Sequence, residues 1–368
     1  MKSLLFLIPS LATRGAERVL VNLVNGLDKN EYRITVQTLF DVGELRKDLS
    51  SKVEYRPGLP FLLRGYVQLM KLFSPQWLYR LIIKKKYDVA VAYLEGSTTR
   101  IISGCPYPDS KKVAWVHIDQ PDMSSLSYCF RSEQETIRCY AKFDRVVAVS
   151  DTIRQHIEKL LDRKCDLLYN IIDSERVLRL SQSSMADLPF STSCNVISVG
   201  CLAPVKGYDR LIRVHRQLLD SGILHHLYLI GIGPQESELK QLVRELHLQD
   251  TIHFLGFRSN PYPYMAQADL YVCSSHNEGL STSVIESLLL GAPVVSTRCS
   301  GAEELLGKAN EYGLVADNSE QGLYDGLIQM LTTSGLLQHY AHQSQDSIRR
   351  FRKEQMLHCH DEFFQKLK

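Results

Sequence analysis

The stretch that decides the fold is Ala268-Asp-Leu-Tyr-Val-Cys-Ser274, then Glu278-Gly-Leu-Ser-Thr-Ser-Val-Ile-Glu286, then Gly291-Ala-Pro-Val-Val-Ser-Thr297. The first part has the apolar pattern of a strand. The second part opens a short helix, which stops at Gly291-Ala-Pro293, and a second apolar strand follows. Short apolar strands separated by helices are typical of parallel sheets that are covered on both faces.

Glu278 and Glu286 stand eight positions apart in this stretch. A carboxylate on the turn and another one turn into the helix can face the same cleft. The N–H groups at the start of the helix lie between them and form a site for phosphate. Such a site suits a nucleotide sugar. The alternative is a capping box, Ser283-Val-Ile-Glu286, in which the Glu side chain returns to the helix start. Spacing alone leaves both interpretations open.

The same alternation runs along the whole chain and predicts an α/β protein with two Rossmann-like domains facing a central cleft. We place the first domain at residues 1–180 and the second at residues 190–345, with a polar linker near 181–193. The pattern predicts one charged amphipathic helix over Gln343–Lys368, which could cap either domain.

The bulk properties limit the functional classes. The chain has 368 residues, a net charge of +2, 44% hydrophobic and 23% charged residues. A charge so near zero argues against nucleic acid as a partner. The nine cysteines are scattered, which favours reduced thiols in a cytosolic protein over disulfides or a zinc site. We read the apolar N-terminus as a buried strand rather than a signal peptide, and no stretch is apolar enough for a transmembrane helix.

Residues 57–86 differ from the rest of the chain. They contain six basic residues, no acidic residue, and five aromatic residues among Leu and Ile. Basic and aromatic residues on apolar helices are typical of a surface at an anionic membrane interface. The alternative is an ordinary core-facing helix with lysines at its C-terminal end, where the helix dipole favours them. The absence of acidic residues favours the membrane.

Further motifs lie in matching order along the chain. They are Thr13-Arg-Gly-Ala-Glu17, Trp115-Val-His117, Tyr169-Asn-Ile-Ile-Asp173, Val199-Gly-Cys-Leu-Ala-Pro-Val-Lys-Gly207, Leu229-Ile-Gly-Ile-Gly-Pro234 and Phe254-Leu-Gly-Phe257. With the paired glutamates, these motifs make the chain resemble, over essentially its whole length, the family-4 retaining glycosyltransferases of the GT-B fold. The resemblance implies that the C-terminal domain binds the nucleotide sugar and the N-terminal domain the acceptor. It also implies that the last helix, 350–368, crosses back to the first domain.

The resemblance also implies roles for particular residues. Glu278 would contact hydroxyls of the donor sugar, Glu286 the ribose, Lys206 the diphosphate, and His117 would lie beside the transferred sugar. The catalytic residues it implies are His117, Glu278 and Lys206. The donor-binding residues it implies are Arg14, Gly15, Gly200, Lys206, Gly231, Phe257, Glu278, Gly279, Leu280, Ser281 and Glu286. There is no Asp-x-Asp motif, so we expect no metal and no cofactor, the nucleotide sugar being the substrate.

Two departures from the family pattern affect the donor site. The family commonly has an Arg where this chain has Cys201, and its glycine loop often has two adjacent glycines where this chain has Arg14 and Gly15. Losing a preorganised charge-stabilising donor typically costs about 3–4 kcal/mol. We therefore expect another group to compensate or the donor to bind more weakly.

The resulting hypothesis is a retaining, metal-independent hexosyltransferase. It would move a hexose or N-acetylhexosamine from a UDP-sugar to a lipid-linked or oligosaccharide acceptor in capsule or surface-polysaccharide synthesis. UDP is favoured by its frequency in the family. The protein would be cytoplasmic and peripheral on the inner face of the plasma membrane, bound through residues 57–86. The alternatives are a sugar-nucleotide epimerase of the same fold and a non-catalytic partner subunit.

Overall fold

The computed structural model describes residues 1–12, 15–183, 190–191 and 193–367. Its internal contacts divide the chain into two compact units. Unit 1 comprises Met1–Ile171 and Glu354–Lys368, and unit 2 comprises Ile172–Lys353. Each unit has its own parallel sheet with helices on its faces, which confirms the predicted α/β class.

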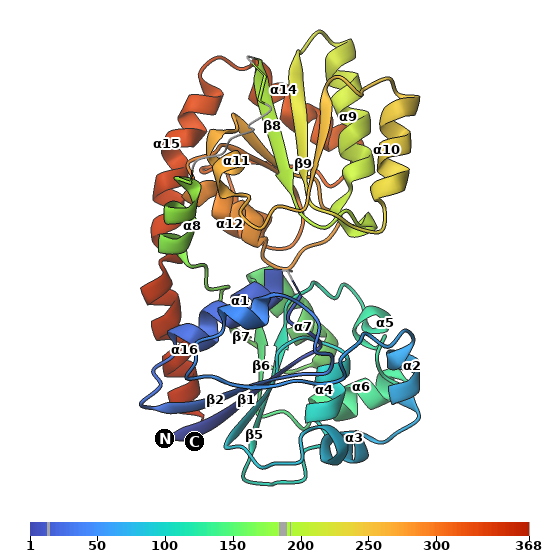
Figure 1. Ribbon diagram of the computed structural model, residues 1–368, viewed down its shortest axis with the longest axis vertical. Coiled ribbons are helices and arrows are strands. Elements are labelled where there is room, and N and C mark those ends of the chain that lie inside the picture. Colours follow the sequence, from blue (N-terminus) through green and yellow to red (C-terminus); the bar gives the residue numbers. More distant parts are fainter. Residues whose placement is uncertain (13–14, 184–189, 192, 368) are drawn as a thin grey trace. The chain divides into compact units, whose positions relative to one another are not determined.

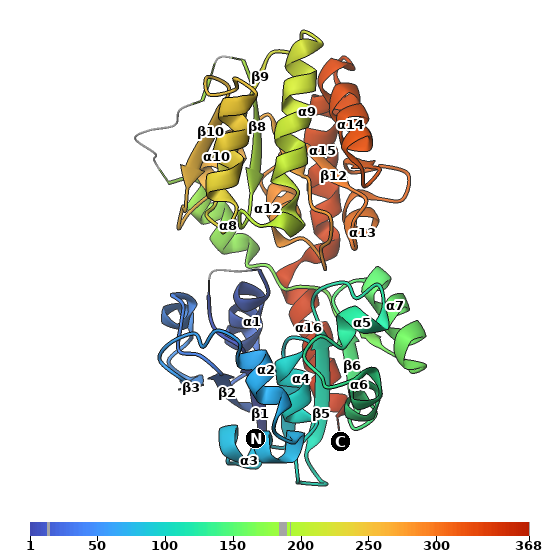
Figure 2. The same cartoon turned by 90° about the vertical axis from the view of Figure 1, so that its right-hand side faces the viewer.

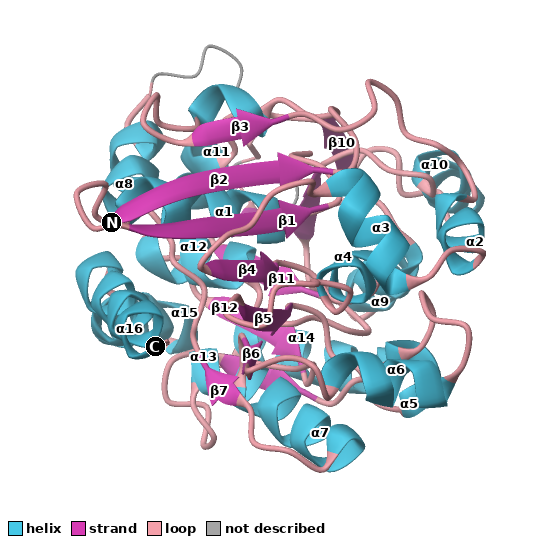
Figure 3. Cartoon of the chain, turned by 90° about the horizontal axis from the view of Figure 1, so that it is seen from below, coloured by secondary structure: helices cyan, strands magenta, loops and turns pink. Residues whose placement is uncertain are grey.

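Unit 1 is built on a seven-stranded sheet of order β3-β2-β1-β4-β5-β6-β7, which Figure 3 shows in that sequence. All pairs are parallel, and Leu4 to Ile8 of β1 are fully buried. Such apolar runs form central strands because both sheet faces are covered. Its elements are β1 (Lys2–Ile8), α1 (Gly15–Gly26), β2 (Tyr32–Thr38), η1 (Leu45–Asp48), β3 (Glu54–Arg56), α2 (Tyr66–Lys71), α3 (Pro75–Ile82), β4 (Val89–Ala92), α4 (Ser97–Ile102), β5 (Lys111–Val116), α5 (Met123–Leu126), α6 (Glu133–Tyr140), β6 (Arg145–Ala148), α7 (Asp151–Leu161) and β7 (Asp166–Leu167).

Unit 2 is built on a six-stranded parallel sheet of order β10-β9-β8-β11-β12-β13. Helices α9, α10 and α14 pack together on one face, and α8, α11, α12 and α15 form a second group (Figures 1 and 2). Its elements are α8 (Ser174–Ser181), β8 (Cys194–Val199), η2 (Pro204–Lys206), α9 (Tyr208–Asp220), β9 (His225–Ile230), α10 (Glu236–Glu245), β10 (Ile252–Gly256), α11 (Tyr262–Gln267), β11 (Leu270–Cys273), α12 (Thr282–Leu289), β12 (Val294–Thr297), α13 (Ala302–Leu306), β13 (Leu314–Ala316), α14 (Glu320–Thr332) and α15 (Leu336–Ile348).

The predicted single helix over Gln343–Lys368 is wrong. Helix α15 ends at Ile348, a 3₁₀ turn η3 (Arg349–Phe351) follows, and α16 (Lys353–Lys366) begins after it. The two helices pack on different partners: α15 contacts α12 in unit 2, whereas α16 belongs to unit 1 from Glu354 on. In unit 1 the ring of Phe364 packs 5.7 Å from that of Phe6, and the Lys2 ammonium donates to the Phe364 carbonyl at 2.8 Å.

The boundary between the units differs from the predicted one. Helix α8 lies within the range assigned to the first domain, yet it packs on α11 and α12 of unit 2. The Asn260 side-chain amide also donates to the Leu180 carbonyl at 2.9 Å. The polar sequence of α8 hid this packing, because Val177 is its only fully buried residue in the described structure.

Candidate functional site

The strand order of unit 2 reverses between β8 and β11, and ligands of open α/β sheets bind at the carboxyl ends of strands at such a point. β8 leads into η2, which ends with Lys206, and β11 leads into the loop that contains Glu278. A small pocket lies there. It is lined by Ser198, Val199, Lys206, Tyr208, Tyr271, Cys273, Ser274, Ser275, Glu278 and Ser283.

Lys206 and Glu278, 72 positions apart in the sequence, form an ion pair in this pocket. The Lys206 Nζ lies 2.6 Å from Glu278 Oε1, which also accepts from the Ser275 hydroxyl at 2.6 Å. Desolvation is the largest single effect and lowers the pKa of Lys206, but the charge and hydrogen bond of Glu278, together with the nearby Cys273 and Tyr208, outweigh it and raise that pKa above its usual value. The pocket therefore presents a fixed ammonium beside an acidic hydrogen-bond acceptor.

A buried arginine holds the loop that follows β11 and leads to Glu278. The Arg210 guanidinium donates to the carbonyls of Ser274 at 2.8 and 2.5 Å and of Ser275 at 2.7 Å. The Ser274 hydroxyl donates to the Lys206 carbonyl at 2.8 Å, which ties the loop to η2. Gly207, with φ +60°, allows the close approach, because a Cβ there would lie 2.3 Å from the Ser274 carbonyl oxygen.

Glu286 lies inside α12, where its Oε1 accepts from the Tyr262 hydroxyl at 3.0 Å. The capping-box alternative is wrong, because the N-cap is Ser281 and Ser283 lies within the helix. The Ser281 side chain makes no capping hydrogen bond to the backbone and instead lies 3.2 Å from the Ser283 hydroxyl. Ser283, in the first turn of α12, lines the pocket, so the start of this helix lies beside it.

The predicted glycines of unit 2 lie where the backbone is crowded. A Cβ on Gly200 would lie 2.9 Å from the Tyr208 hydroxyl and 3.7 Å from Lys206 Cε. Gly231 has φ +142°, and a Cβ there would lie 1.9 Å from the Gly200 carbonyl oxygen. These glycines keep the ends of β8 and β9 together beside Lys206. Phe257, just after β10, is 49% exposed.

The remaining predicted residues belong to unit 1. His117 follows β5 and is 6% exposed, and desolvation, helped by nearby His360, lowers its pKa to about 3. Its main-chain N–H donates to Glu95 Oε2 at 2.9 Å. Gly15 is the first residue of α1. Arg14 lies outside the described residues.

Four residues that hold the predicted site residues or their loops in place were not predicted from the sequence: Ser275, Arg210, Tyr262 and Glu95. Ser275 stands three positions before Glu278 at the end of an apolar strand, and Glu95 likewise follows an apolar strand, so a search of strand ends could have found both. Arg210 and Tyr262 contact residues that are distant in the sequence, so no sequence pattern indicated their roles.

Among the described residues, no set of three or more His, Cys, Asp and Glu residues is grouped so that it could hold a metal ion. No helix in the described ranges has the length and apolar character needed to cross a membrane.

Sequence comparisons match both halves of the chain to glycosyltransferase families. Residues 13–176 match the family described as "Glycosyltransferase Family 4", and residues 185–347 match "Glycosyl transferases group 1". A relative from Campylobacter jejuni is 29% identical over 96% of both chains and is named N-acetylgalactosamine-N,N'-diacetylbacillosaminyl-diphospho-undecaprenol 4-alpha-N-acetylgalactosaminyltransferase. A lipopolysaccharide core biosynthesis glycosyltransferase of Rhizobium meliloti is 25% identical over 91% of this chain and 90% of its own.

Solved structures share the fold. The Anabaena protein HepE, in complex with UDP and glucose, superposes with a TM-score of 0.75 at 20% identity, covering both chains completely. Sucrose-phosphate synthase of Thermosynechococcus elongatus gives a TM-score of 0.80 at 15% identity, covering 100% of this chain and 99% of its own. With the two domain matches, these findings confirm the resemblance seen in the sequence. The chain belongs to the GT-B glycosyltransferases, with a family 4 domain in its N-terminal half and a group 1 domain in its C-terminal half.

Proposed function

We propose that the protein is a retaining, metal-independent hexosyltransferase that moves a hexose or N-acetylhexosamine from a UDP-sugar to a lipid-linked glycan. The observation that supports this most is the Lys206–Glu278 pair at the switch point of unit 2. An ammonium suits a diphosphate, and a carboxylate beside it suits sugar hydroxyls. The Campylobacter jejuni relative is named for transfer to a diphospho-undecaprenol-linked glycan, and the Anabaena structure holds UDP, which supports the donor and acceptor classes.

In this proposal the transferred sugar passes through an oxocarbenium-like transition state while negative charge grows on the departing UDP. Lys206 and the N-terminus of α12 stabilise that charge. Glu278 orients the sugar by accepting from its hydroxyls, and Glu286 accepts from the ribose. His117 lies beside the transferred sugar. The acceptor attacks on the face from which UDP leaves, so the configuration at the anomeric carbon is kept.

The test begins with thermal unfolding in the presence of UDP-N-acetylgalactosamine, UDP-N-acetylglucosamine, UDP-glucose, UDP-galactose, and GDP and ADP counterparts, because a bound ligand stabilises the native state. The protective UDP-sugar is then incubated with N-acetylhexosaminyl-diphospho-undecaprenol vesicles, with and without EDTA. We expect an α-linked product by NMR and unchanged turnover with EDTA. Protection by GDP- or ADP-sugars alone contradicts the UDP assignment, and a β-linked product contradicts retention. Conversion of the UDP-sugar without any acceptor indicates the epimerase alternative.

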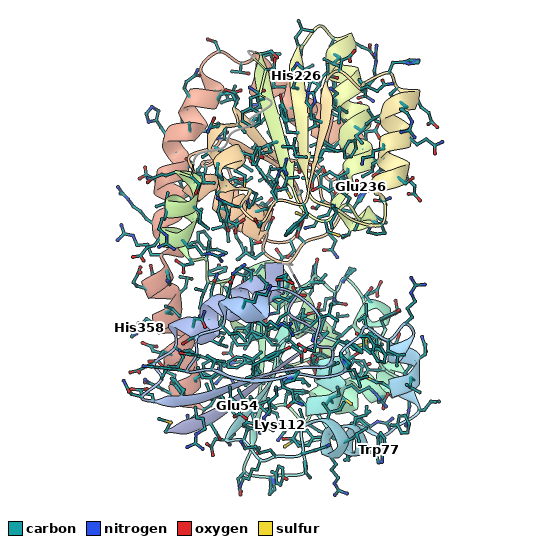
Figure 4. All side chains as sticks on the ribbon, viewed as in Figure 1. Glu54, Trp77, Lys112, His226, Glu236 and His358 are labelled. Carbon is teal, nitrogen blue, oxygen red and sulfur yellow. The ribbon has the colours of Figure 1, made fainter. Side chains whose placement is uncertain are left out.

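We also propose that residues 57–86 bind an anionic membrane on the cytoplasmic side, which brings unit 1 to a lipid-linked acceptor. The support is a set of side chains on and around α2 and α3 that is both apolar and exposed; Trp77 on α3 is labelled in Figure 4. The exposed fractions are 57% for Phe61, 61% for Leu62, 47% for Leu69, 73% for Leu72, 45% for Trp77 and 48% for Leu81. Exposed apolar groups beside basic ones are typical of a protein surface that binds a membrane.

The basic residues of this segment are not equivalent. Lys85 lies 3.9 Å from Glu54 and Lys86 lies 3.2 Å from Asp109, so acids from outside the segment partly neutralise them. Arg64 and Arg80 are exposed, and replacing them gives the more direct test. A basic residue near an anionic surface contributes about 1 kcal/mol, so replacing both by Gln should weaken vesicle binding about 30-fold.

The measurement is co-sedimentation with phosphatidylglycerol vesicles at two salt concentrations. Arg216→Gln with Lys240→Gln in unit 2 removes the same charge elsewhere and is the matched control. If the Arg64/Arg80 double variant and the control both bind as the wild type does, electrostatic attraction does not contribute to vesicle binding. If Leu72→Ser with Trp77→Ser also leaves binding unchanged, the membrane proposal fails, whatever the outcome of the donor experiments.

A further inference from the structure

A carboxylate outside the donor site lies at the carboxyl edge of the unit 1 sheet. Glu95 follows β4, and the strand order of this sheet reverses between β1 and β4. This is the position where open α/β sheets bind ligands. Gly96 has φ +93°, and a Cβ there would lie 2.8 Å from the Cys129 sulfur. The backbone therefore turns sharply after Glu95 and keeps it at the edge.

At this edge main-chain N–H groups pair with the Glu95 carboxylate, whereas the Nε2 of His117 has no partner among the described residues. Glu95 Oε2 accepts from the His117 main-chain N–H at 2.9 Å, and no cation in the described ranges forms an ion pair with Glu95. The His117 Nε2 is buried and has no hydrogen-bond partner among the described residues. Buried polar atoms are almost always paired, so an orphaned one indicates a ligand or an ordered water.

The chemistry of these groups selects the ligand class. Because the pKa of His117 is lowered to about 3, its ring is neutral, and Glu95 has no cation beside it. A carboxylate and a neutral imidazole attract hydroxyl and amide N–H groups, whereas a phosphate would meet repulsion. The edge therefore suits the neutral hydroxyls of a sugar rather than the diphosphate of a lipid carrier.

We propose that Glu95 is a catalytic residue that binds the attacking hydroxyl of the acceptor sugar, an inference that rests on the proposed glycosyl transfer. The hydroxyl oxygen bonds to the anomeric carbon of the donor as the bond from that carbon to the diphosphate oxygen breaks. The hydroxyl proton moves to the Glu95 carboxylate as UDP departs with the electron pair of the broken bond, and Glu95 then releases the proton to solvent. Glu95 accepts a hydrogen bond from the hydroxyl and holds it in the attacking orientation.

The pH dependence of glycosyl transfer should reflect the ionisation of Glu95. Burial raises its pKa to about 7, against the opposing effect of main-chain N–H groups. The other titratable groups near it are His117, the Cys129 thiol and the Tyr140 hydroxyl from α6. Desolvation lowers the pKa of the His117 ring and raises the pKa values of the other two, so all three stay neutral around pH 7. Transfer should therefore rise with pH through about 7 as Glu95 ionises.

The decisive variant is Glu95→Gln, which keeps the shape and removes the charge. The matched control is Glu133→Gln on the exposed side of α6. For Glu95→Gln we expect kcat for transfer to fall about 100-fold and the ascending limb near pH 7 to disappear. Protection from unfolding by UDP should stay at the wild-type level. A kcat within threefold of wild type with the limb intact overturns the proposal.

A second readout needs no turnover. Saturation-transfer NMR with methyl α-N-acetylgalactosaminide measures sugar binding to the wild type, Glu95→Gln and Glu133→Gln. Loss of the signal in Glu95→Gln alone supports the proposal, and equal signals in all three proteins overturn it. If UDP and UDP-sugars fail to protect the wild type, the proposed function fails at its donor half, which this NMR experiment does not test.

Discussion

The ion pair between Lys206 and Glu278 gives the most direct test of the donor site, through the variants Glu278→Gln, Lys206→Met and the double variant. The side chains are 26% and 12% exposed, so the pair lies between surface and fully buried ion pairs. Exposed pairs contribute about 0.2–1 kcal/mol, and breaking a buried pair costs about 3–5 kcal/mol. We therefore expect a coupling free energy of about 2 kcal/mol in the ligand-free protein.

Urea unfolding of the four proteins measures this coupling in a double-mutant cycle. Glu278→Gln retains an oxygen that can accept from the Ser275 hydroxyl, so the loss should be that of the charge pair. A coupling below about 0.3 kcal/mol, the usual error of additivity, would show that the pair does not form in solution.

The same variants separate the two proposed roles. Glu278→Gln should lower kcat/KM about 100-fold, which is about 2.7 kcal/mol of transition-state stabilisation. Its affinity for UDP alone should stay equal or rise, because Lys206 no longer has to leave a carboxylate to reach the diphosphate. Lys206→Met should weaken UDP binding and lower kcat. Calorimetry with UDP and steady-state kinetics measure both. Weaker UDP binding by Glu278→Gln would refute the assigned roles.

Three further predictions concern the scaffold. Arg210→Met removes the donors to two main-chain carbonyls and should lower the free energy of unfolding by about 3 kcal/mol in urea, whereas a change below 1 kcal/mol would deny it a structural role. Gly231→Ala should reduce soluble yield and thermal stability sharply, because its Cβ would meet the Gly200 carbonyl; a wild-type melting temperature would contradict this. His117 and His360 have pKa values lowered to about 3 and about 4. As the pH falls, these histidines bind protons in the unfolded chain before they do so in the folded protein. The free energy of unfolding should therefore fall as the pH drops below about 6.5, by about 2 kcal/mol per histidine at pH 5. When unfolding is measured at several pH values, His360→Gln should lose less stability at acid pH than the wild type does.

Much of the fold was predictable because its central strands are uniformly apolar and its helices are strongly periodic. Helix α9, Tyr208–Asp220, has such a period, with Leu211, Val214 and Leu218 among its buried residues. The failures occurred where the local pattern is compatible with more than one packing. No Gly or Pro stands between α15 and α16, so the break at Arg349–Phe351 is set by packing in two different units rather than by a helix-breaking residue.

The contact between Lys206 and Glu278 was not predictable from the sequence. Lys206 and Glu278 were each expected near the donor, yet nothing in their sequence spacing showed that they neutralise each other in the free protein. Sequence patterns locate strand ends well, because apolar runs mark them. They do not give the distances between side chains from different strands, and these contacts depend on such distances.

Cys201 stands where the family commonly has an arginine. A thiol brings no fixed positive charge to the loop, but a Cβ on neighbouring Gly200 would lie 3.7 Å from Lys206 Cε, so Lys206 places its side chain beside this loop. Behind the loop, the Arg210 guanidinium is 3% exposed and its hydrogen bonds in the described structure go to main-chain carbonyls. Carbonyl dipoles therefore balance its charge at hydrogen-bond distance, and the carboxylates of Asp209 and Glu320 act on it through space. In a poorly solvated place such a charge acts over several ångströms. It favours a diphosphate in the adjoining pocket even without contact, so Arg210→Lys should retain more UDP affinity than Arg210→Met.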